Sequence, residues 1–164
     1  MKNLVSIMYF ALAICLCLQF NVTNVWAQDD LNGAWQATEA WGNNSEDGDW
    51  ELKDLQPSLY IFLDGYYSIM LVTGEKARPL MKKDATRSSI SDEEMRSIFM
   101  PFIANSGTYE VKGSSITTKP MVALWPNFME GESDTFQYRF ENDMLVLSDE
   151  GEDWNWTAKF KRLE

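Results

Sequence analysis

The sequence contains no histidine. Without imidazole side chains, Ser-His-Asp and Cys-His catalytic arrangements, histidine proton shuttles and histidine-containing zinc sites are excluded. Positive charge is also scarce, because 14 Lys and Arg residues stand against 25 Asp and Glu residues and leave a net charge of −11. This excess of negative charge disfavours nucleic acid or an anionic membrane surface as an electrostatic partner.

Cysteine is nearly absent, and both cysteines, Cys15 and Cys17, lie close to the N-terminus. They fall within an almost wholly apolar run at residues 4–20, which precedes Val25-Trp26-Ala27, a sequence typical of a cleavage site. We therefore expect residues 1–27 to be a signal peptide and the protein to be exported, either to a periplasm or out of the cell. An uncleaved leader that anchors the protein in a membrane is the alternative.

Residues 28–164 would form the mature domain, and they contain no cysteine. The fold therefore needs a core that is sufficient without disulfides, for which a chain of this length is adequate. From residue 31 onward, short alternating runs are separated by turn residues, which predicts an antiparallel sheet or barrel. We expect eight strands, at Gly33–Trp41, Ser58–Leu63, Tyr66–Thr73, Gly107–Val111, Ser115–Ala123, Thr135–Glu141, Met144–Leu147 and Trp154–Arg162.

Turn residues predict how some of these strands pair. If Asn142-Asp143 is a two-residue turn, Phe140 lies opposite Leu145, and the alternating aromatic residues of the preceding strand share one face with the aliphatic residues that follow. A four-residue loop at 149–152 then places Leu147 opposite Trp154. On this register, the residues of the last strand that face inward are Trp154, Trp156, Ala158 and Phe160.

The hairpin around Asp64-Gly65 is less decisive, because both of its faces are apolar and the pattern does not say which one is inside.

One helix is expected after this hairpin. Ser91-Asp92-Glu93-Glu94 forms a capping box, in which the Ser91 side chain satisfies free backbone amides and the Glu94 side chain reaches back to the Ser91 amide. Apolar residues then recur at helical spacing up to Pro101, which lacks an amide and should end the helix near Met100.

Two long connections differ in charge. Residues 42–57 carry five acidic side chains against one lysine, and residues 74–90 carry five basic side chains against two acidic ones. The acidic connection approximates the ligand spacing of a calcium loop, but its first, third and last positions depart from that pattern. We therefore expect a solvated acidic loop, with no metal site and no cofactor.

Four short segments occur in an order that resembles a known family. Gly33-Ala34-Trp35 stands at the start of the first expected strand, Tyr60–Tyr66 forms an aromatic hairpin, Ser106–Tyr109 follows the expected helix, and Trp125-Pro126-Asn127 opens a later loop. This order resembles the lipocalin-like barrels of the calycin group, in particular small exported bacterial lipocalin-like domains. The resemblance implies an all-β fold, an eight-stranded antiparallel up-and-down barrel with one short helix between strands three and four.

The resemblance also implies particular roles for some residues. Because Arg162 shares the inward parity of the last strand, it is the basic residue that would stack on Trp35 of the Gly-x-Trp motif, which begins at Gly33, and close one end of the barrel. Inward and mouth-lining aromatic residues would contact a ligand, although a packed core and anchored loops are the alternative interpretation. The expected ligand-contacting residues are Trp41, Trp125, Phe128, Phe136, Tyr138, Trp154 and Trp156.

The expected function is non-catalytic binding of a small hydrophobic or amphiphilic molecule in the lumen. Two alternatives stay open: an interaction module with a filled barrel that docks through its mouth loops, and a calycin-type enzyme. The carboxylates cluster in turns and loops and form no recognisable acid and base pair, which disfavours an enzyme. We expect no nucleic-acid partner and no stable membrane insertion once the leader is removed, and the sequence names no protein partner.

Overall fold

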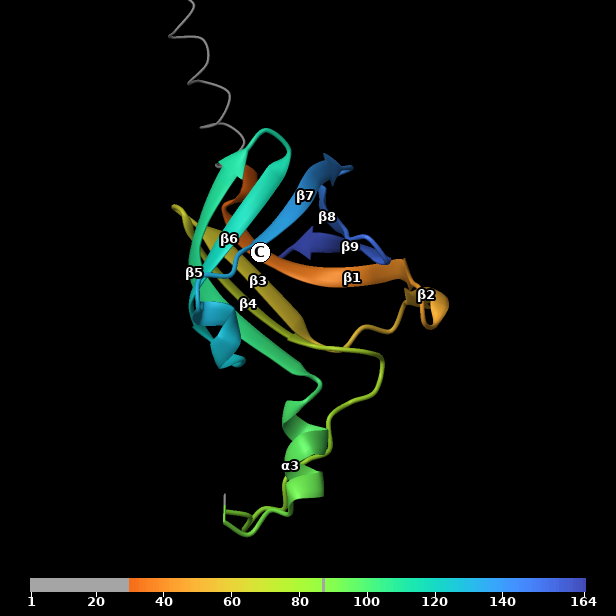
Figure 1. The fold of residues 1–164 in the computed structure, drawn as a ribbon, viewed down its shortest axis with the longest axis vertical. Helices are drawn as coiled ribbons and strands as arrows, with labels where there is room; N and C mark the ends of the chain where they lie inside the picture. The colour runs from red at the N-terminus through yellow and green to blue at the C-terminus, as the bar shows by residue number, and fades with distance from the viewer. Residues whose placement is uncertain (1–29, 87) are drawn as a thin grey trace, which may run out of the picture.

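Nine β-strands make up most of the residues that a computed structural model describes, which are 30–86 and 88–164. Eight of them close into an antiparallel barrel, because β1 pairs with β3 on one side and with β9 on the other (Figure 1). The expected eight-stranded antiparallel barrel is therefore confirmed. The strands are β1 (Gly33–Asn44), β2 (Gly48–Leu52), β3 (Ser58–Leu63), β4 (Tyr66–Val72), β5 (Phe102–Lys112), β6 (Ser115–Ala123), β7 (Asp134–Glu141), β8 (Met144–Glu150) and β9 (Trp154–Arg162).

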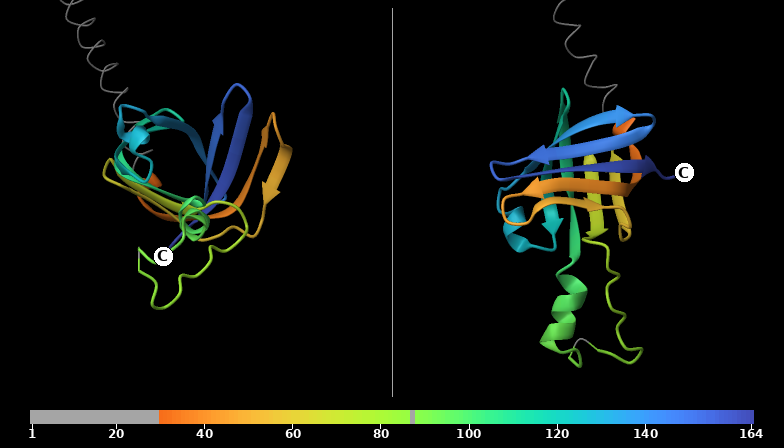
Figure 2. Two further views of the ribbon diagram at one scale, coloured as in Figure 1. Left: turned by 60° about the horizontal axis from the view of Figure 1, so that its bottom comes forward. Right: turned by 90° about the vertical axis from the view of Figure 1, so that its right-hand side faces the viewer.

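From β3 to β9, each strand pairs with the next one along the chain, as in an up-and-down barrel. The expected leader, residues 1–27, lies outside the described residues. The helix α3 (Asp92–Phe99) separates β4 from β5, and it projects with the preceding connection beyond one edge of the barrel (Figure 2). Its N-terminus carries the expected capping box, in which the Ser91 side chain accepts from the Glu94 amide and the Glu94 side chain accepts from the Ser91 amide.

The ninth strand, β2, corrects the expectation that residues 42–57 form a solvated loop. It pairs with the end of β1 from Ala40 to Asn44, beside the entrance of the barrel. Its Trp50 lies opposite Gly42, where an added Cβ would come within 2.7 Å of the indole ring. The acidic side chains Asp49 and Glu51 alternate with Trp50 and Leu52, so the strand turns its apolar residues to one face.

The turn between β7 and β8 fixes the register there as the sequence predicts. Asn142 and Asp143 both have positive φ, as a type I′ turn requires, and Phe140 lies opposite Leu145. The expected pairing of Leu147 with Trp154 is wrong, because β8 continues to Glu150 and Leu147 lies opposite Ala158. The partner moves by an even number of residues, so the inward face of β9 is preserved from Trp156 to Phe160.

The inner face of the β3–β4 hairpin is now defined. Phe62, Tyr67 and Ile69 are buried, and Tyr60 packs against the same core. The opposite face, with Leu63, Tyr66 and Met70 among its residues, is exposed on the outside of the barrel. Two other boundaries differ from expectation by more than one residue, since β5 begins at Phe102 rather than Gly107 and β1 continues past Trp41 to Asn44.

One end of the barrel is closed by Leu31, which precedes β1, and by residues of the first and last strands. Leu31 is fully buried and accepts a hydrogen bond of 2.9 Å from the indole nitrogen of Trp35 through its carbonyl oxygen. The guanidinium of Arg162 lies over the Trp35 ring, which is the contact that the resemblance implies. Gly33 has a φ of 143°, and a Cβ there would collide with Arg162, so only glycine allows this close approach.

Candidate functional site in the barrel lumen

The barrel contains a cavity of about 460 Å³ that opens at the end opposite to Trp35 and Arg162. Its wall combines inward side chains of most barrel strands with the apolar side chains of β2 and the β2–β3 connection, including Trp50, Leu52 and Leu55. Such a volume falls within the range of small-molecule pockets. The closed end and the open end together give the lumen the form of a cup.

Two of the expected ligand-contacting residues line this cavity. Phe136 on β7 and Trp156 on β9 meet edge to face, with their ring centroids 5.6 Å apart. Both strands turn these side chains inward because β-strand residues alternate between two faces. Phe136 and Trp156 therefore form an aromatic wall that remains accessible from the lumen.

The structure places two other expected residues in the strands that form the cavity wall, but away from the cavity. Tyr138 is buried deeper in the barrel and packs edge to face with Phe140 at 6.1 Å between centroids. Trp154 does not lie in the lumen as expected. It is 44% exposed at the start of β9, because the β8–β9 hairpin reaches beyond Trp156 and carries it past the lumen, against Gly151.

The remaining three expected residues lie outside the lumen. Trp41 lies on the outer side of β1, where the Lys159 ammonium is 5.3 Å from its ring centroid. Trp125 is 52% exposed, and Phe128 lies in the short 3-10 helix η1 (Pro126–Met129) that follows β6. Both belong to a connection at the mouth end of the barrel, but neither lines the cavity.

Several cavity residues were missed or left undecided by the sequence. Tyr60 lies on the hairpin whose inner face was undecided, and Phe160 was expected to face inward but not to contact a ligand. These two residues line the cavity and pack edge to face, with centroids 4.6 Å apart. Ile69 faces them from β4. Trp50 and Leu52 come from the strand that was expected to be a loop, and the only signal for it was the alternation of these two apolar residues with acidic ones.

The polar groups of the cavity are few. Asn105 and Asp134 are among them. The pKa of the Asp134 carboxyl is raised, first by burial and then by the nearby negative charges of Asp149 and Glu132. Burial also raises the pKa of the Tyr60 hydroxyl above its usual range. Asp134 is therefore a carboxylate in surroundings that disfavour its ionised form.

A second polar cluster lies behind the wall. Burial raises the pKa of Tyr67 to about 12, with Thr118 opposing the shift and the Asp134 charge adding to it. The Tyr67 hydroxyl forms no hydrogen bond with any residue that the structure describes. Thr118 is fully buried and donates a hydrogen bond of 3.4 Å to the Asp134 carbonyl. The hydrogen bond from Thr118 ties the start of β7 to β6.

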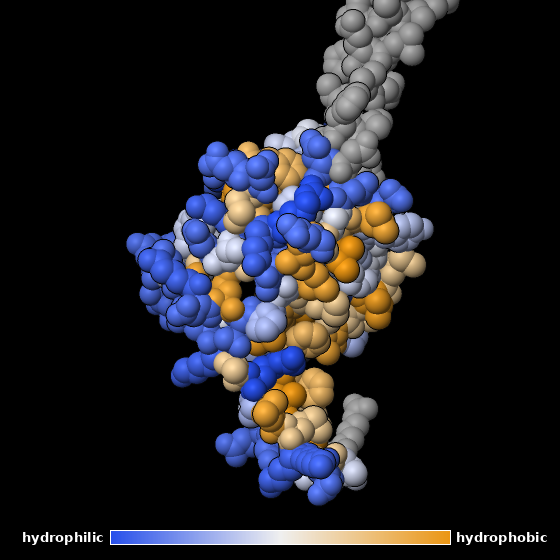
Figure 3. Space-filling model, turned by 180° about the vertical axis from the view of Figure 1, so that it is seen from behind, coloured by the Kyte–Doolittle hydropathy of each residue, from blue (hydrophilic) through white to orange (hydrophobic). Residues whose placement is uncertain are grey.

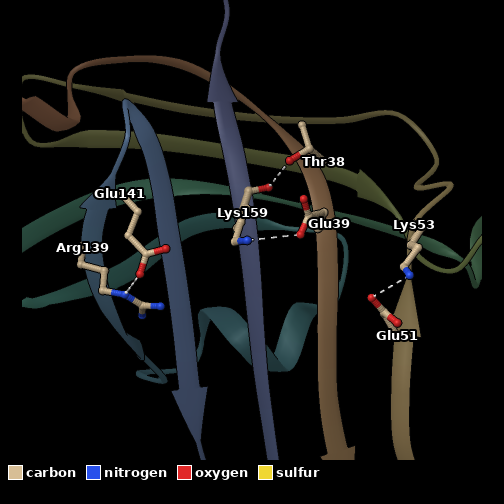
Figure 4. A network of polar contacts seen from close by, with 7 residues as sticks. All are labelled: Thr38, Glu39, Glu51, Lys53, Arg139, Glu141 and Lys159. Atoms are coloured by element: carbon tan, nitrogen blue, oxygen red, sulfur yellow. Dashed lines mark hydrogen bonds and ion pairs between the residues drawn. The ribbon is translucent and has the colours of Figure 1, made fainter.

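Cations of the barrel wall point away from the lumen. The Arg139 side chain pairs with Glu141 at 2.6 Å, and the Lys159 side chain pairs with Glu39 at 3.3 Å. Figure 4 shows both pairs. The Arg139 side chain is exposed, on the face of β7 opposite to the buried Phe136 and Tyr138. No lysine or arginine stands among the described residues that line the cavity.

Another hollow, of about 620 Å³, lies outside the barrel between the outer face of β3–β5 and the connection that leads to α3. Leu59 and Met70 form part of its floor, and Leu80 and Met81 form part of its rim. A space-filling view of this side shows apolar side chains gathered over the barrel wall and over the projecting arm (Figure 3). The hollow is more open than the lumen, and Phe102 is the single aromatic residue among the described residues that line it.

Among residues 30–86 and 88–164, no helix is long and apolar enough to cross a membrane. The same residues contain no group of three or more acidic side chains placed to hold a metal ion together. Of the described residues that line the cavity, Asp134 is the single one with a charged type of side chain.

Comparisons with known proteins address the family. A family model described as a lipocalin-like domain matches residues 58–162. A crystal structure of a lipocalin-like protein from Bacteroides uniformis ATCC 8492 is 18% identical, with a TM-score of 0.44, covering 82% of this chain and 99% of the other. An uncharacterized protein from Bacteroides eggerthii DSM 20697 is 14% identical, with a TM-score of 0.42, covering 81% and 99%. No curated protein matches. The family match spans most of the barrel, and the chain therefore belongs to the lipocalin-like domain family.

Proposed function

We propose that this protein binds a small hydrophobic or amphiphilic molecule in the barrel lumen and does not act on it chemically. The observation that carries the proposal is the cavity of about 460 Å³ whose wall is mostly apolar and includes Phe136 and Trp156. Burying apolar ligand surface against such a wall is favourable by roughly 25 cal/mol for each Å² removed from water.

The difference between the two ends of the barrel, one filled and one open, supports this proposal. At one end, Leu31 and Trp35 fill the space between the strands, so a ligand has no way through. At the other end, Trp50 and Leu55 extend the apolar wall past the barrel strands. A cup of this kind holds a ligand by its apolar part and leaves a polar part near the mouth.

Chemistry on the ligand is disfavoured by the composition of the wall. Acid and base catalysis uses two groups whose protonation states differ, and Asp134 carries the single carboxyl among the described residues that line the cavity, with no lysine or arginine beside it in that lining. We therefore place the protein among carriers or sensors of small molecules. Recovery of a chemically altered ligand after incubation with the protein would contradict this assignment.

Binding can be tested with two variants that add the same bulk on opposite sides of the barrel. Ala40 lines the cavity, whereas Ala104 lies opposite Met70 on the outer face. Native mass spectrometry of protein from its own host should reveal a co-purifying small molecule in the wild type and in Ala104→Leu, and less of it in Ala40→Leu. Empty wild-type protein, together with unchanged tryptophan fluorescence across a panel of neutral, cationic and anionic chain compounds, would overturn the proposal.

We also propose that the protein works after export, on the basis of the apolar run and cleavage-like sequence at residues 1–27. The test is the N-terminal sequence and intact mass of protein from its own host. A mature chain that begins at Gln28 supports export by a cleaved signal peptide. A chain that retains residues 1–27 and sediments with membranes supports the anchored alternative.

A further inference from the structure

The charged side chain that lines the cavity is acidic. Asp134 lines the cavity, and no lysine or arginine does so among the described residues. Within the same residues, no ion pair joins the Asp134 carboxylate to a cation, whereas four surface carboxylates have such partners, those of Glu39, Glu51, Glu110 and Glu141. A carboxylate at the edge of an apolar cavity thus has no lysine or arginine of the described residues paired with it.

The charges that act on Asp134 from nearby residues are negative as well. The two charges that act most on its carboxyl, those of Asp149 and Glu132, are also negative, and together with burial they raise its pKa. A positive charge next to Asp134 would relieve both repulsions, whereas a negative charge would add a third. An anionic head group, such as that of a fatty acid, would therefore meet repulsion at the mouth and no compensating cation.

Aromatic rings lie on the same face as this carboxylate. Phe136 is two residues from Asp134 on β7, so the two side chains leave the strand on the same side, and Trp156 packs against Phe136 at 5.6 Å between centroids. Aromatic faces attract cations through the quadrupole of the ring, most strongly for tryptophan. A carboxylate beside two rings is a setting that suits an ammonium group.

We infer that the lumen selects amphiphiles with a cationic amine head group, which lies against Asp134, Phe136 and Trp156 while the apolar chain enters the cup. This inference rests on the proposed binding function and assigns its ligand class. The amine forms a charge-assisted hydrogen bond with the Asp134 carboxylate if it carries a proton, and an ion pair if it is quaternary. Tyr60, Ile69 and Phe160 surround the chain deeper in the cavity.

The test compares three probes with the same ten-carbon chain: decyltrimethylammonium, 1-decanol and decanoate. Each is titrated below its micelle concentration, and binding is followed by tryptophan fluorescence and calorimetry. For wild-type protein we expect the cation to bind most tightly and decanoate most weakly, with a difference of about tenfold or more between them. Decanol reports the affinity of the apolar cup alone.

Two variants separate a local effect of Asp134 from the net negative charge of the protein. Asp134→Asn should weaken decyltrimethylammonium binding by about fivefold or more and change decanol binding by less than about twofold. Asp143→Asn makes the same substitution in the turn at the closed end, where asparagine tolerates the positive φ, and should preserve the order of the three probes. Circular dichroism verifies that both variants are folded.

The outcomes distinguish the inference from the proposed function. If decanol binds but the three probes bind equally, or if Asp134→Asn leaves cation binding unchanged, the amine site is refuted and the hydrophobic cup remains. If Asp143→Asn weakens cation binding as much as Asp134→Asn does, the preference comes from overall charge and the amine site is again refuted. If no probe binds, the proposed function fails, and the inference fails with it.

Discussion

The guanidinium of Arg162 lies 4.2 Å from the centroid of the Trp35 ring and joins the last strand to the first. The same guanidinium donates hydrogen bonds to the carbonyl oxygens of Asp30 and Asn32, which flank the buried Leu31. One side chain thus holds both the ring and the segment that plugs the barrel. The closed end depends on this contact, and the cup shape of the lumen depends on the closed end.

Replacing Arg162 with alanine should destabilise the barrel by about 1 to 3 kcal/mol, because a cation–π contact and hydrogen bonds from a charged donor are lost. The free energy of unfolding is measured by urea denaturation. Arg139→Ala is the matched control, because Arg139 forms an exposed pair with Glu141 and its removal should change stability by less than about 1 kcal/mol. Equal effects of the two variants would contradict the structural role of Arg162.

Gly33→Ala should destabilise the protein by about 1 to 3 kcal/mol for two reasons. An L-residue is strained at a φ of 143°, and its Cβ would collide with the Arg162 guanidinium. The collision disappears when Arg162 is alanine, so the loss from Gly33→Ala should be smaller in the Arg162→Ala background. A double-mutant cycle of unfolding free energies measures this coupling, and additive effects would show that the two residues act independently.

How well the sequence predicted the strands depended on the turns between them. The β7–β8 register followed from the residues because a two-residue turn leaves one pairing, with Phe140 opposite Leu145. The β8–β9 register was wrong because no residue fixed the length of that connection, and Leu147 lies opposite Ala158 instead of Trp154. The inward face survived because the error was even, which is why Trp156 was correctly expected in the lumen.

The rest of the site could not be predicted for a different reason. Sequence alternation tells which residues share a face, but both faces of the β3–β4 hairpin are apolar, and only tertiary packing puts Tyr60 and Ile69 inside. The outer face is apolar at Leu59 and Met70, where the hollow under the projecting arm lies. β2 was hidden for a related reason, since acidic residues surround Trp50 and Leu52 and made the segment resemble a loop.

Trp156→Ala tests whether Trp156 belongs to the ligand-contacting wall of the lumen or to the packed core. Trp156 is half-buried and lines the cavity, so its loss should reduce affinity for a bound chain compound by about tenfold or more, with destabilisation below that of a core truncation. Phe62→Ala is the comparison, because Phe62 is fully buried and its truncation should cost about 3 to 5 kcal/mol. Fluorescence titration and urea denaturation give the two quantities. A Trp156 variant that is as unstable as the Phe62 variant, with ligand affinity unchanged, would identify Trp156 as packed core.

Ser91→Ala should loosen α3 and leave the barrel intact. The Ser91 side chain accepts from the Glu94 amide at 3.2 Å, and loss of such a cap costs a helix about 0.5 to 2 kcal/mol. None of the residues of α3 is buried, so the helix contributes little to the barrel core. Hydrogen exchange should become faster for the amides of Asp92–Phe99, while the urea midpoint of the barrel stays unchanged. A clear fall in that midpoint would show that the projecting arm and the barrel unfold together.

Asp134→Asn should stabilise the protein near neutral pH and have a diminishing effect as the pH falls. Because the pKa of the folded-state carboxyl is raised above its ordinary value of 3.8, the folded protein binds this proton more tightly than the unfolded chain does. Folding stability from this group is therefore present at low pH and is lost as the pH rises through the folded-state pKa. Above the folded-state pKa, the ionised Asp134 carries this penalty, which asparagine does not have.

The size of the gain should stay below about 1 kcal/mol, because Asp134 is an exposed residue at the start of β7 and solvent screens its repulsion by Asp149 and Glu132. The unfolding free energies of wild type and variant are measured at intervals between pH 7 and pH 4. The difference between the two proteins is compared at each pH, because the titration of the other carboxyls is common to both and cancels. A difference that grows on acidification would contradict the raised pKa. With decyltrimethylammonium present at pH 7, we expect the wild type to become more stable than Asp134→Asn. The wild type should bind this cation more tightly, and a ligand that binds the folded state more tightly raises the free energy of unfolding more.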